Sequence, residues 1–227
     1  MRICLSLKGT FSVNDIRQGY DHTDIYKSKL NESIESIKNS LVNPLVEQGH
    51  TVDIICSTYD TYCASVIESK LSPIKCYKFT RETIGERGGN AEFQLQLMHY
   101  KKILELIKES ENERENKYDF FIFTRFDLIF IGKVTDWNIN YEEFNITMLH
   151  LSGNCDDNVW LFPRKNIDGF TLSINQLSNM RGITHEINKY LINNNVKISY
   201  IYTITEEDHA NNTCYKIYSF NRDIIAK

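Results

Sequence analysis

The chain has 227 residues, of which 41% are hydrophobic and 25% charged, and its formal net charge is −4. This composition is typical of a globular protein and excludes disordered and fibrous classes. The acidic balance disfavours nonspecific binding to nucleic acid. No stretch approaches the roughly 20 apolar residues of a membrane helix, and the first residues lack the features of a signal peptide. We therefore expect one cytoplasmic domain over residues 1–227, with no nucleic-acid partner and no transmembrane segment.

The first part of the chain alternates between strand and helix patterns. Strands are expected at residues 2–7, 51–57 and 74–79, and helices at 24–48, 62–69 and 91–108. The first helix carries apolar residues at spacings of three and four, and Pro44 is expected to break or kink it near its end. Residues 109–117 are charged and are expected to be solvated. Alternation of this kind predicts a parallel sheet with helices on its faces.

The second part has more strand and less helix. Residues 118–131 are the most apolar stretch, and further strands are expected at 145–151, 159–162 and 196–203. Helices are expected at 167–177 and 184–193, and the tail from Thr205 onward is expected to be irregular. The fold class is therefore α/β, of the Rossmann type, with three α/β/α layers around a central, mostly parallel sheet. In such sheets ligands bind beyond the carboxyl ends of the strands.

Several motifs that would identify other enzyme classes are absent. The chain has no G-x-G-x-x-G, no Walker A sequence, no G-x-S-x-G and no H-E-x-x-H. Its six cysteines include no C-x-x-C pair, so they are expected to be buried free thiols and not zinc ligands. Dinucleotide-dependent dehydrogenases, P-loop enzymes, α/β-hydrolases and zincins are disfavoured.

Two opposite charges interrupt the most apolar stretch. Residues two apart on a strand share a face, so Arg125 and Asp127 are expected to project together while Phe126 turns to the core. Burying such charges costs several kcal/mol unless they are paired. One interpretation is a structural ion pair. The other is a phosphate and metal site, in which Asp127 binds Mg²⁺ or Mn²⁺ and Arg125 contacts phosphate.

The same stretch carries a resemblance. Residues 118–128 (YDFFIFTRFDL) are similar to the "YD-hydrophobic-R-T-R-F-D-L" segment of nucleotide-sugar glycosyltransferases, including bacterial capsule and lipopolysaccharide enzymes and the capsid-glycan enzymes of large algal DNA viruses. Residues 43–60, 71–75 and 156–162 also resemble segments of those proteins, so the similarity covers residues 1–165. The resemblance implies a GT-A fold, a nucleoside-diphosphate-sugar donor and a divalent metal. Arg125 stands where the family's D-x-D motif has its first acidic residue.

Residues after the expected strands supply the candidate donor site. Residues 1–130 would form the nucleotide-sugar-binding half and residues 131–227 the acceptor side. Tyr59 is expected to stack on a base, Asp60 to take a uracil or ribose hydrogen bond, and the loop arginines to cradle phosphates. The full set of donor-binding candidates is Lys8, Gly9, Thr10, Thr58, Tyr59, Asp60, Arg81, Arg87, Asn90, Gln94, Thr124 and Arg125. Ordinary turns and a mobile solvated loop are the alternatives for these positions.

Two further positions complete the candidate chemistry. Asp156 and Asp157 cannot both face one pocket from a regular strand, and Asp157 is the candidate general base toward an acceptor hydroxyl. In a retaining enzyme Asp157 would position the sugar or stabilise charge, and an Asx-type turn is the structural alternative. The resemblance implies a late metal ligand, for which His209 is the candidate, although a lone surface histidine is the alternative.

The leading hypothesis is a glycosyltransferase that moves a sugar from a UDP-linked donor to a hydroxyl of a glycan or glycoprotein. Arg125, Asp127 and Asp157 would carry the catalysis, with Mn²⁺ or Mg²⁺ as cofactor. The alternatives are a sugar-phosphate nucleotidyltransferase and a catalytically inactive relative that binds nucleotide or glycan. The oligomeric state stays open, and a viral protein of this kind would act in the host cytoplasm.

Overall fold

The computed structural model describes residues 1–9, 23–80, 91–149, 153–180, 184–203 and 217–220. Within these residues a seven-stranded sheet has the order β3-β2-β1-β4-β7-β6-β8. Its strands are β1 (Arg2–Lys8), β2 (Thr51–Tyr59), β3 (Lys75–Phe79), β4 (Phe120–Arg125), β6 (Phe144–Leu149), β7 (Trp160–Pro163) and β8 (Ile198–Thr203). The mixed α/β class expected from the alternating pattern is confirmed.

The sheet is mostly parallel. β1 pairs in parallel with β2 and β4, β2 with β3, and β6 with β8, whereas β7 runs antiparallel to both of its neighbours. The order β3-β2-β1-β4 is the one that the first strands of a Rossmann-type sheet adopt. The sheet is therefore compatible with a Rossmann-like fold, with one reversed strand inserted.

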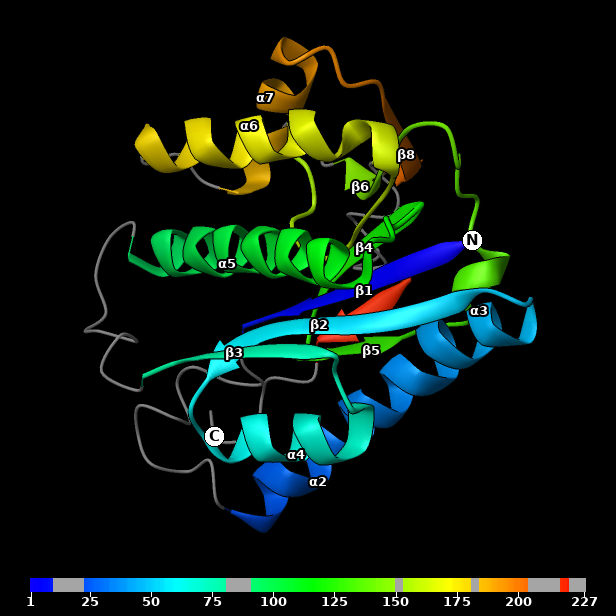
Figure 1. Cartoon of the computed structure of the whole chain (residues 1–227), viewed down its shortest axis with the longest axis vertical. Coiled ribbons are helices and arrows are strands. Elements are labelled where there is room, and N and C mark those ends of the chain that lie inside the picture. Colours follow the sequence, from blue (N-terminus) through cyan, green and yellow to red (C-terminus); the bar gives the residue numbers. More distant parts are fainter. Residues whose placement is uncertain (10–22, 81–90, 150–152, 181–183, 204–216, 221–227) are drawn as a thin grey trace, which may run out of the picture.

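Helices cover both faces of the sheet, which gives three layers (Figure 1). One face carries α2 (Asp24–Ile37), the π-helical segment η1 (Lys38–Val42), α3 (Asn43–Glu47) and α4 (Tyr62–Leu71). The other face carries α5 (Ala91–Arg114), α6 (Ile167–Asn179) and α7 (Ile187–Asn193). Short 3₁₀ turns lie at η3 (Val134–Asp136), η4 (Arg164–Asn166) and η5 (Thr184–Glu186). Each face has its own apolar cluster, and the central strands contribute to both.

The first expected helix is interrupted, as Pro44 predicts. Leu30, Ile34 and Leu41 are fully buried on its apolar stripe, yet α2 ends at Ile37 and a π-helical turn follows. Proline has no N–H for the helical ladder. The chain instead closes this turn with a wider hydrogen bond from the N–H of Asn43 to the carbonyl of Lys38. Pro44 then lies at the start of α3, where its missing N–H costs nothing.

The apolar stretch 118–131 is not one strand, which corrects the sequence-based expectation. β4 ends at Arg125, residues 126 and 127 form a turn, and β5 (Leu128–Phe130) pairs with β9 (Tyr218–Phe220) in a separate two-stranded sheet. Phe126 is fully buried, as expected. The turn contains neither glycine nor proline, so composition gave no signal for it. β9 also shows that the tail is not wholly irregular.

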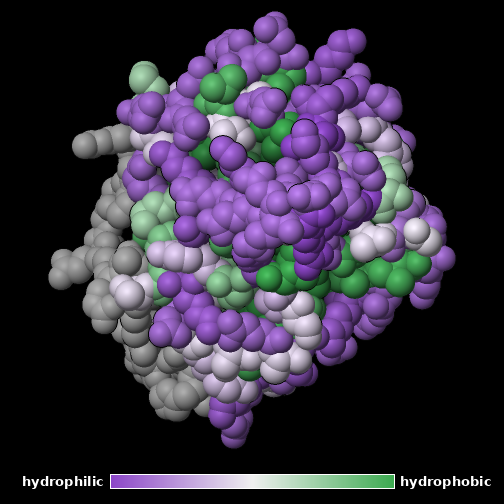
Figure 2. All heavy atoms as spheres, viewed as in Figure 1, coloured by the Kyte–Doolittle hydropathy of each residue, from purple (hydrophilic) through white to green (hydrophobic). Residues whose placement is uncertain are grey.

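The helix α5 extends further than its apolar pattern predicts. Ser110 and Glu111 are buried, although residues 109–117 were expected to be solvated. Glu111 can be buried because its carboxylate accepts hydrogen bonds from Arg164 and from the N–H of Tyr118. Hydrophilic residues nevertheless cover most of the face seen in Figure 2, over α5 as well. None of the helices within the described residues is long and apolar enough to span a bilayer.

Candidate functional site

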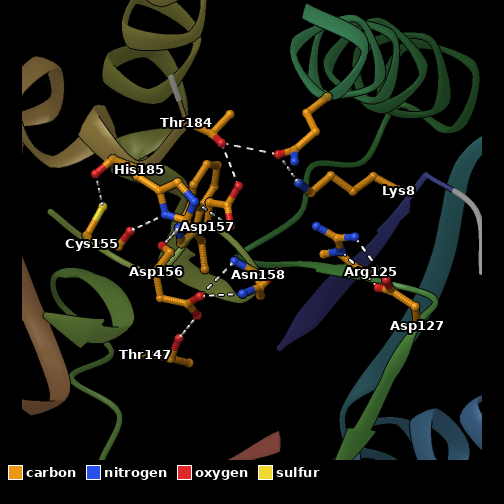
Figure 3. Close-up of polar contacts among 12 residues, drawn as sticks. Lys8, Arg125, Asp127, Thr147, Cys155, Asp156, Asp157, Asn158, Thr184 and His185 are labelled. Carbon is orange, nitrogen blue, oxygen red and sulfur yellow. Dashed lines mark hydrogen bonds and ion pairs between the residues drawn. The ribbon is translucent and has the colours of Figure 1, made fainter. Parts of the chain in front are cut away.

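The candidate site lies at the carboxyl ends of β1 and β4. The chain runs from β1 outward to β2 on one side, while β4 lies on the other side, so these two strands meet at the topological switch point where open α/β sheets bind ligands. Lys8 and Arg125 are direct partners in the register of the two strands. Directly paired residues share a face, and Figure 3 shows both side chains directed toward one space.

The reversed strand β7 brings a third group to this place. Because β7 runs antiparallel to β4, its amino end lies beside the carboxyl end of β4. Asp156, Asp157 and Asn158 immediately precede β7. Asp157 therefore faces Lys8 and Arg125, although it is more than 30 residues from Arg125 in the sequence.

Lys8 is a buried ammonium group without an ionic partner among the described residues. Lys8 is 2% exposed. Its Nζ lies 3.3 Å from Oε1 of Gln96 and 4.2 Å from the ring centroid of Tyr100. Burial lowers the pKa of Lys8 to about 7; Asp157 opposes this shift and Arg125 adds to it. The group is thus poised between its charged and neutral forms near neutral pH.

Arg125 forms a two-point ion pair with Asp127. Nε lies 2.8 Å from Oδ1 and Nη2 lies 2.9 Å from Oδ2, so both carboxylate oxygens accept hydrogen bonds. Burial lowers the pKa of Arg125, but the charge and hydrogen bonds of Asp127 outweigh it, and the pKa stays above its ordinary value. Asp127 is 2% exposed, whereas the Arg125 side chain is 19% exposed. The guanidinium is therefore the accessible member of the pair.

Asp157 is held as a carboxylate. Oγ1 of Thr184 donates to its Oδ2 over 2.5 Å, and Nε2 of His185 lies 3.9 Å from its Oδ1. Burial alone would raise the pKa of Asp157. The charges of Lys8, His185 and Arg125 lower it by more than burial raises it, so the net pKa is below its usual value. A negative charge thus faces two cationic groups across the site.

Asp156 points away from the site and has a structural environment. Its carboxylate accepts hydrogen bonds from Thr147, from Nδ2 of Asn158 over 2.5 Å and from the Tyr218 hydroxyl over 2.7 Å. Burial and the neighbouring Asp157 raise its pKa. The two adjacent acids therefore face different surroundings, as the sequence argument required of them.

The other predicted site residues that the structure describes are less available. Tyr59 is 2% exposed and packs on His99 and Phe79, so its ring offers no free face to a base, which corrects that expectation. Thr58 and Thr124 are fully buried, and their hydroxyl oxygens have no hydrogen-bond partner within the described residues.

Gly9, Asp60 and Gln94 are the remaining donor-binding candidates that the structure describes. Gly9 has φ +85°, and a Cβ added there would meet nothing within 4 Å, so the backbone beside Lys8 is open to approach. Asp60 is exposed, and the side chain of Gln94 is half-buried. Thr10, Arg81, Arg87, Asn90 and His209 lie outside the described residues.

Sequence reasoning missed four residues that the fold brings to this place: Gln96, Tyr100, Thr184 and His185. Gln96 and Tyr100 lie four residues apart on α5 and therefore share a face. The shared face was a usable signal. Thr184 and His185 begin the segment before α7, and nothing in their local pattern pointed toward Asp157.

The carboxylates described here do not present a ready site for a divalent cation. Both oxygens of Asp127 are engaged by Arg125, and no group of three or more His, Cys, Asp or Glu side chains with metal-binding geometry occurs in the described part of the chain. Asp157 faces cationic and hydroxyl groups instead. As arranged, the Asp127 carboxylate does not fit Mn²⁺ or Mg²⁺, while the metal role expected of His209, which lies outside the described residues, stays a prediction.

No family model matches the chain, and no curated protein matches it. Two cations whose donor hydrogens are partly unused within the described residues, an open glycine backbone and one opposing carboxylate suit a small ligand that carries phosphate.

Proposed function

We propose that the chain is a GT-A-type glycosyltransferase that moves a sugar from a nucleoside-diphosphate donor, UDP-linked, to a hydroxyl of a glycan or glycoprotein. The observation that carries the proposal is the in-register pairing of Lys8 with Arg125 at the switch point, opposite Asp157. The resemblance of residues 118–128 to nucleotide-sugar glycosyltransferases supports the same reaction class.

Charge is the main requirement of such a transfer. As the bond between the sugar and the diphosphate breaks, negative charge grows on the leaving oxygen, and fixed cations placed there lower the barrier. Lys8 and Arg125 supply two such groups, and Arg125 is preorganised by its ion pair with Asp127. The burial of both groups strengthens their interaction with phosphate.

Asp157 would act on the other side of the reacting carbon. Its low pKa keeps it ionised at neutral pH, so it accepts a hydrogen bond from an acceptor hydroxyl or stabilises positive charge on the sugar. The hydroxyl of Thr184 fixes one of its oxygens and leaves the other beside His185.

The test is release of nucleoside diphosphate from a panel of nucleotide sugars. We expect turnover by the native protein and loss of about 100-fold or more in Asp157→Asn, the scale of a lost acid–base or charge-stabilising group. Asp127→Ala is expected to abolish turnover while the protein stays folded. Asp136→Asn, which changes an exposed acid in η3, is the matched control.

A second panel tests the alternative enzyme class. A nucleotidyltransferase would consume a nucleoside triphosphate with a sugar phosphate and release pyrophosphate, and it would leave nucleotide sugars intact. An inactive binding relative would show a raised melting temperature with UDP but no turnover with any donor. Absence of both binding and turnover with all nucleotides would refute the proposal.

A further inference from the structure

The ion pair between Arg125 and Asp127 has the geometry of an orienting contact. The carboxylate engages Nε and Nη2, which fixes the plane of the guanidinium. Nη1 makes no hydrogen bond within the described residues and is directed toward the space that Lys8 also faces. Asp127 thus engages one side of the guanidinium, and the opposite side makes no hydrogen bond within the described residues.

Lys8 adds a second available donor at the same place. An ammonium group has three donor hydrogens, and its one hydrogen bond in the described structure is to Gln96. A buried cation that forms no ion pair costs several kcal/mol, and Lys8 forms none within the described residues, although the charge of Asp157 acts on it. Such a cost is explained when the group meets an anion during function. Lys8 pairs with Arg125 in the register of β1 and β4, so the two residues lie side by side at the spacing of adjacent strands.

Asp127 cannot serve a metal ion and Arg125 in this arrangement at the same time. A cation on its carboxylate would displace at least one of the two guanidinium hydrogen bonds. The displaced guanidinium would then lie, mostly shielded from solvent, beside a second positive charge, which is unfavourable.

We propose that Lys8 and Arg125 together bind the diphosphate of the donor without a divalent cation, and that Asp127 is a positioning residue for Arg125 and not a metal ligand. The inference rests on the proposed function for the identity of the ligand. We call Lys8 and Arg125 the diphosphate clamp. The clamp requires only a diphosphate, so inorganic pyrophosphate is a sufficient probe.

Titration calorimetry with UDP and with pyrophosphate tests this on the full chain, in EDTA and then in Mn²⁺. We expect the native protein to bind both ligands in EDTA. We expect Mn²⁺ to change the affinity by less than about threefold, which corresponds to less than about 0.7 kcal/mol because tenfold corresponds to about 1.4 kcal/mol. This comparison needs no variant and so does not depend on the folding of one.

A double-mutant cycle separates positioning from ligation. Arg125→Lys keeps the charge but removes the fork, and Asp127→Asn removes the carboxylate charge. Each single change is expected to weaken pyrophosphate binding about tenfold in EDTA, and the double variant to be no weaker than Arg125→Lys alone, because the two residues act through one group. Glu142→Gln, which removes an exposed acid paired with Lys165, is the control and should bind normally.

The outcomes distinguish the inference from the proposed function. Binding that needs Mn²⁺, or an Asp127→Asn defect seen only with Mn²⁺, overturns the clamp and leaves the glycosyltransferase proposal standing. Pyrophosphate binding in EDTA without UDP binding supports the clamp and argues against a nucleotide donor. If neither UDP nor pyrophosphate binds in EDTA or in Mn²⁺, the clamp and the glycosyltransferase proposal are both overturned.

Discussion

Replacing Lys8 with methionine should make the protein more stable while abolishing ligand binding. Burial lowers the pKa of Lys8 from 10.5 to about 7. Each pH unit of that difference corresponds to about 1.4 kcal/mol, so the charged form is destabilised in the folded state by up to about 5 kcal/mol. Methionine has a similar length and no charge, and thus removes this cost.

Part of the gain is offset by lost contacts. Methionine forms neither the hydrogen bond to Gln96 nor the cation–π contact with Tyr100, which together contribute about 2–3 kcal/mol. We expect a net increase of about 2 kcal/mol in the free energy of unfolding below pH 7. For a chain of this size that corresponds to a rise in melting temperature of about 4–8 °C.

The pH dependence identifies the cause. Between pH 7 and 10.5 the unfolded chain holds a proton on Lys8 that the folded protein has lost, so the native protein becomes more stable as pH rises. The advantage of Lys8→Met should therefore be full below pH 7 and shrink toward pH 10.5. Urea unfolding of both proteins at pH 6, 7, 8 and 9 measures this.

The control is Lys165→Met, which changes an exposed lysine and should shift stability little at any pH. A Lys8→Met variant that is less stable at pH 6, or whose difference from the native protein is constant across the pH range, would refute the assignment of a desolvated ammonium.

Three other perturbations test the surroundings of the site and the rest of the fold. Asp53→Asn should lower the free energy of unfolding by about 2 kcal/mol in urea titrations, because this buried carboxylate accepts hydrogen bonds from both Arg2 and Arg114; an unchanged midpoint would contradict the role of that network. Among the five cysteines that the structure describes, Cys76 should react first with iodoacetamide by mass spectrometry, since it is half-buried and its hydrogen bond with Cys56 lowers its pKa; faster labelling of a buried cysteine would count against the fold. Asp156→Asn should be neutral or stabilising at pH 7, because the raised pKa of this carboxyl makes the folded protein lose stability as pH rises above 3.8; a large loss at pH 7 in thermal melts would show that the charge is needed.

The sequence predicted the layers of the fold well because they depend on periodic burial. Apolar residues at helical spacing between Leu30 and Leu41 and the strand patterns near the N-terminus led directly to the observed elements. The turn at Phe126 and Asp127 was missed because apolar, strand-like residues stand on both sides of it, and the pairing of β5 with the distant β9 shows that the second part belongs to another sheet.

The site was predictable only in part. The charges of Lys8, Arg125 and Asp157 stand at strand ends, which is a local signal that a pattern can detect. Gln96 shares a face of α5 with Tyr100, which is a local signal, whereas Thr184 is placed by how η5 packs, and no local pattern encodes that. The burial of Tyr59 likewise depends on the distant His99.

The reversed strand β7 has a consequence for how the protein acquires activity. The groups of the site come from residues as far apart as Lys8 and Thr184, so a folding unit that contains them all must span most of the chain. Contacts of such long sequence separation carry a large loop-closure entropy and are slow to form. Nucleotide or pyrophosphate should accordingly protect the molecule only against global unfolding, and hydrogen exchange of the fraying helix ends should be indifferent to its presence.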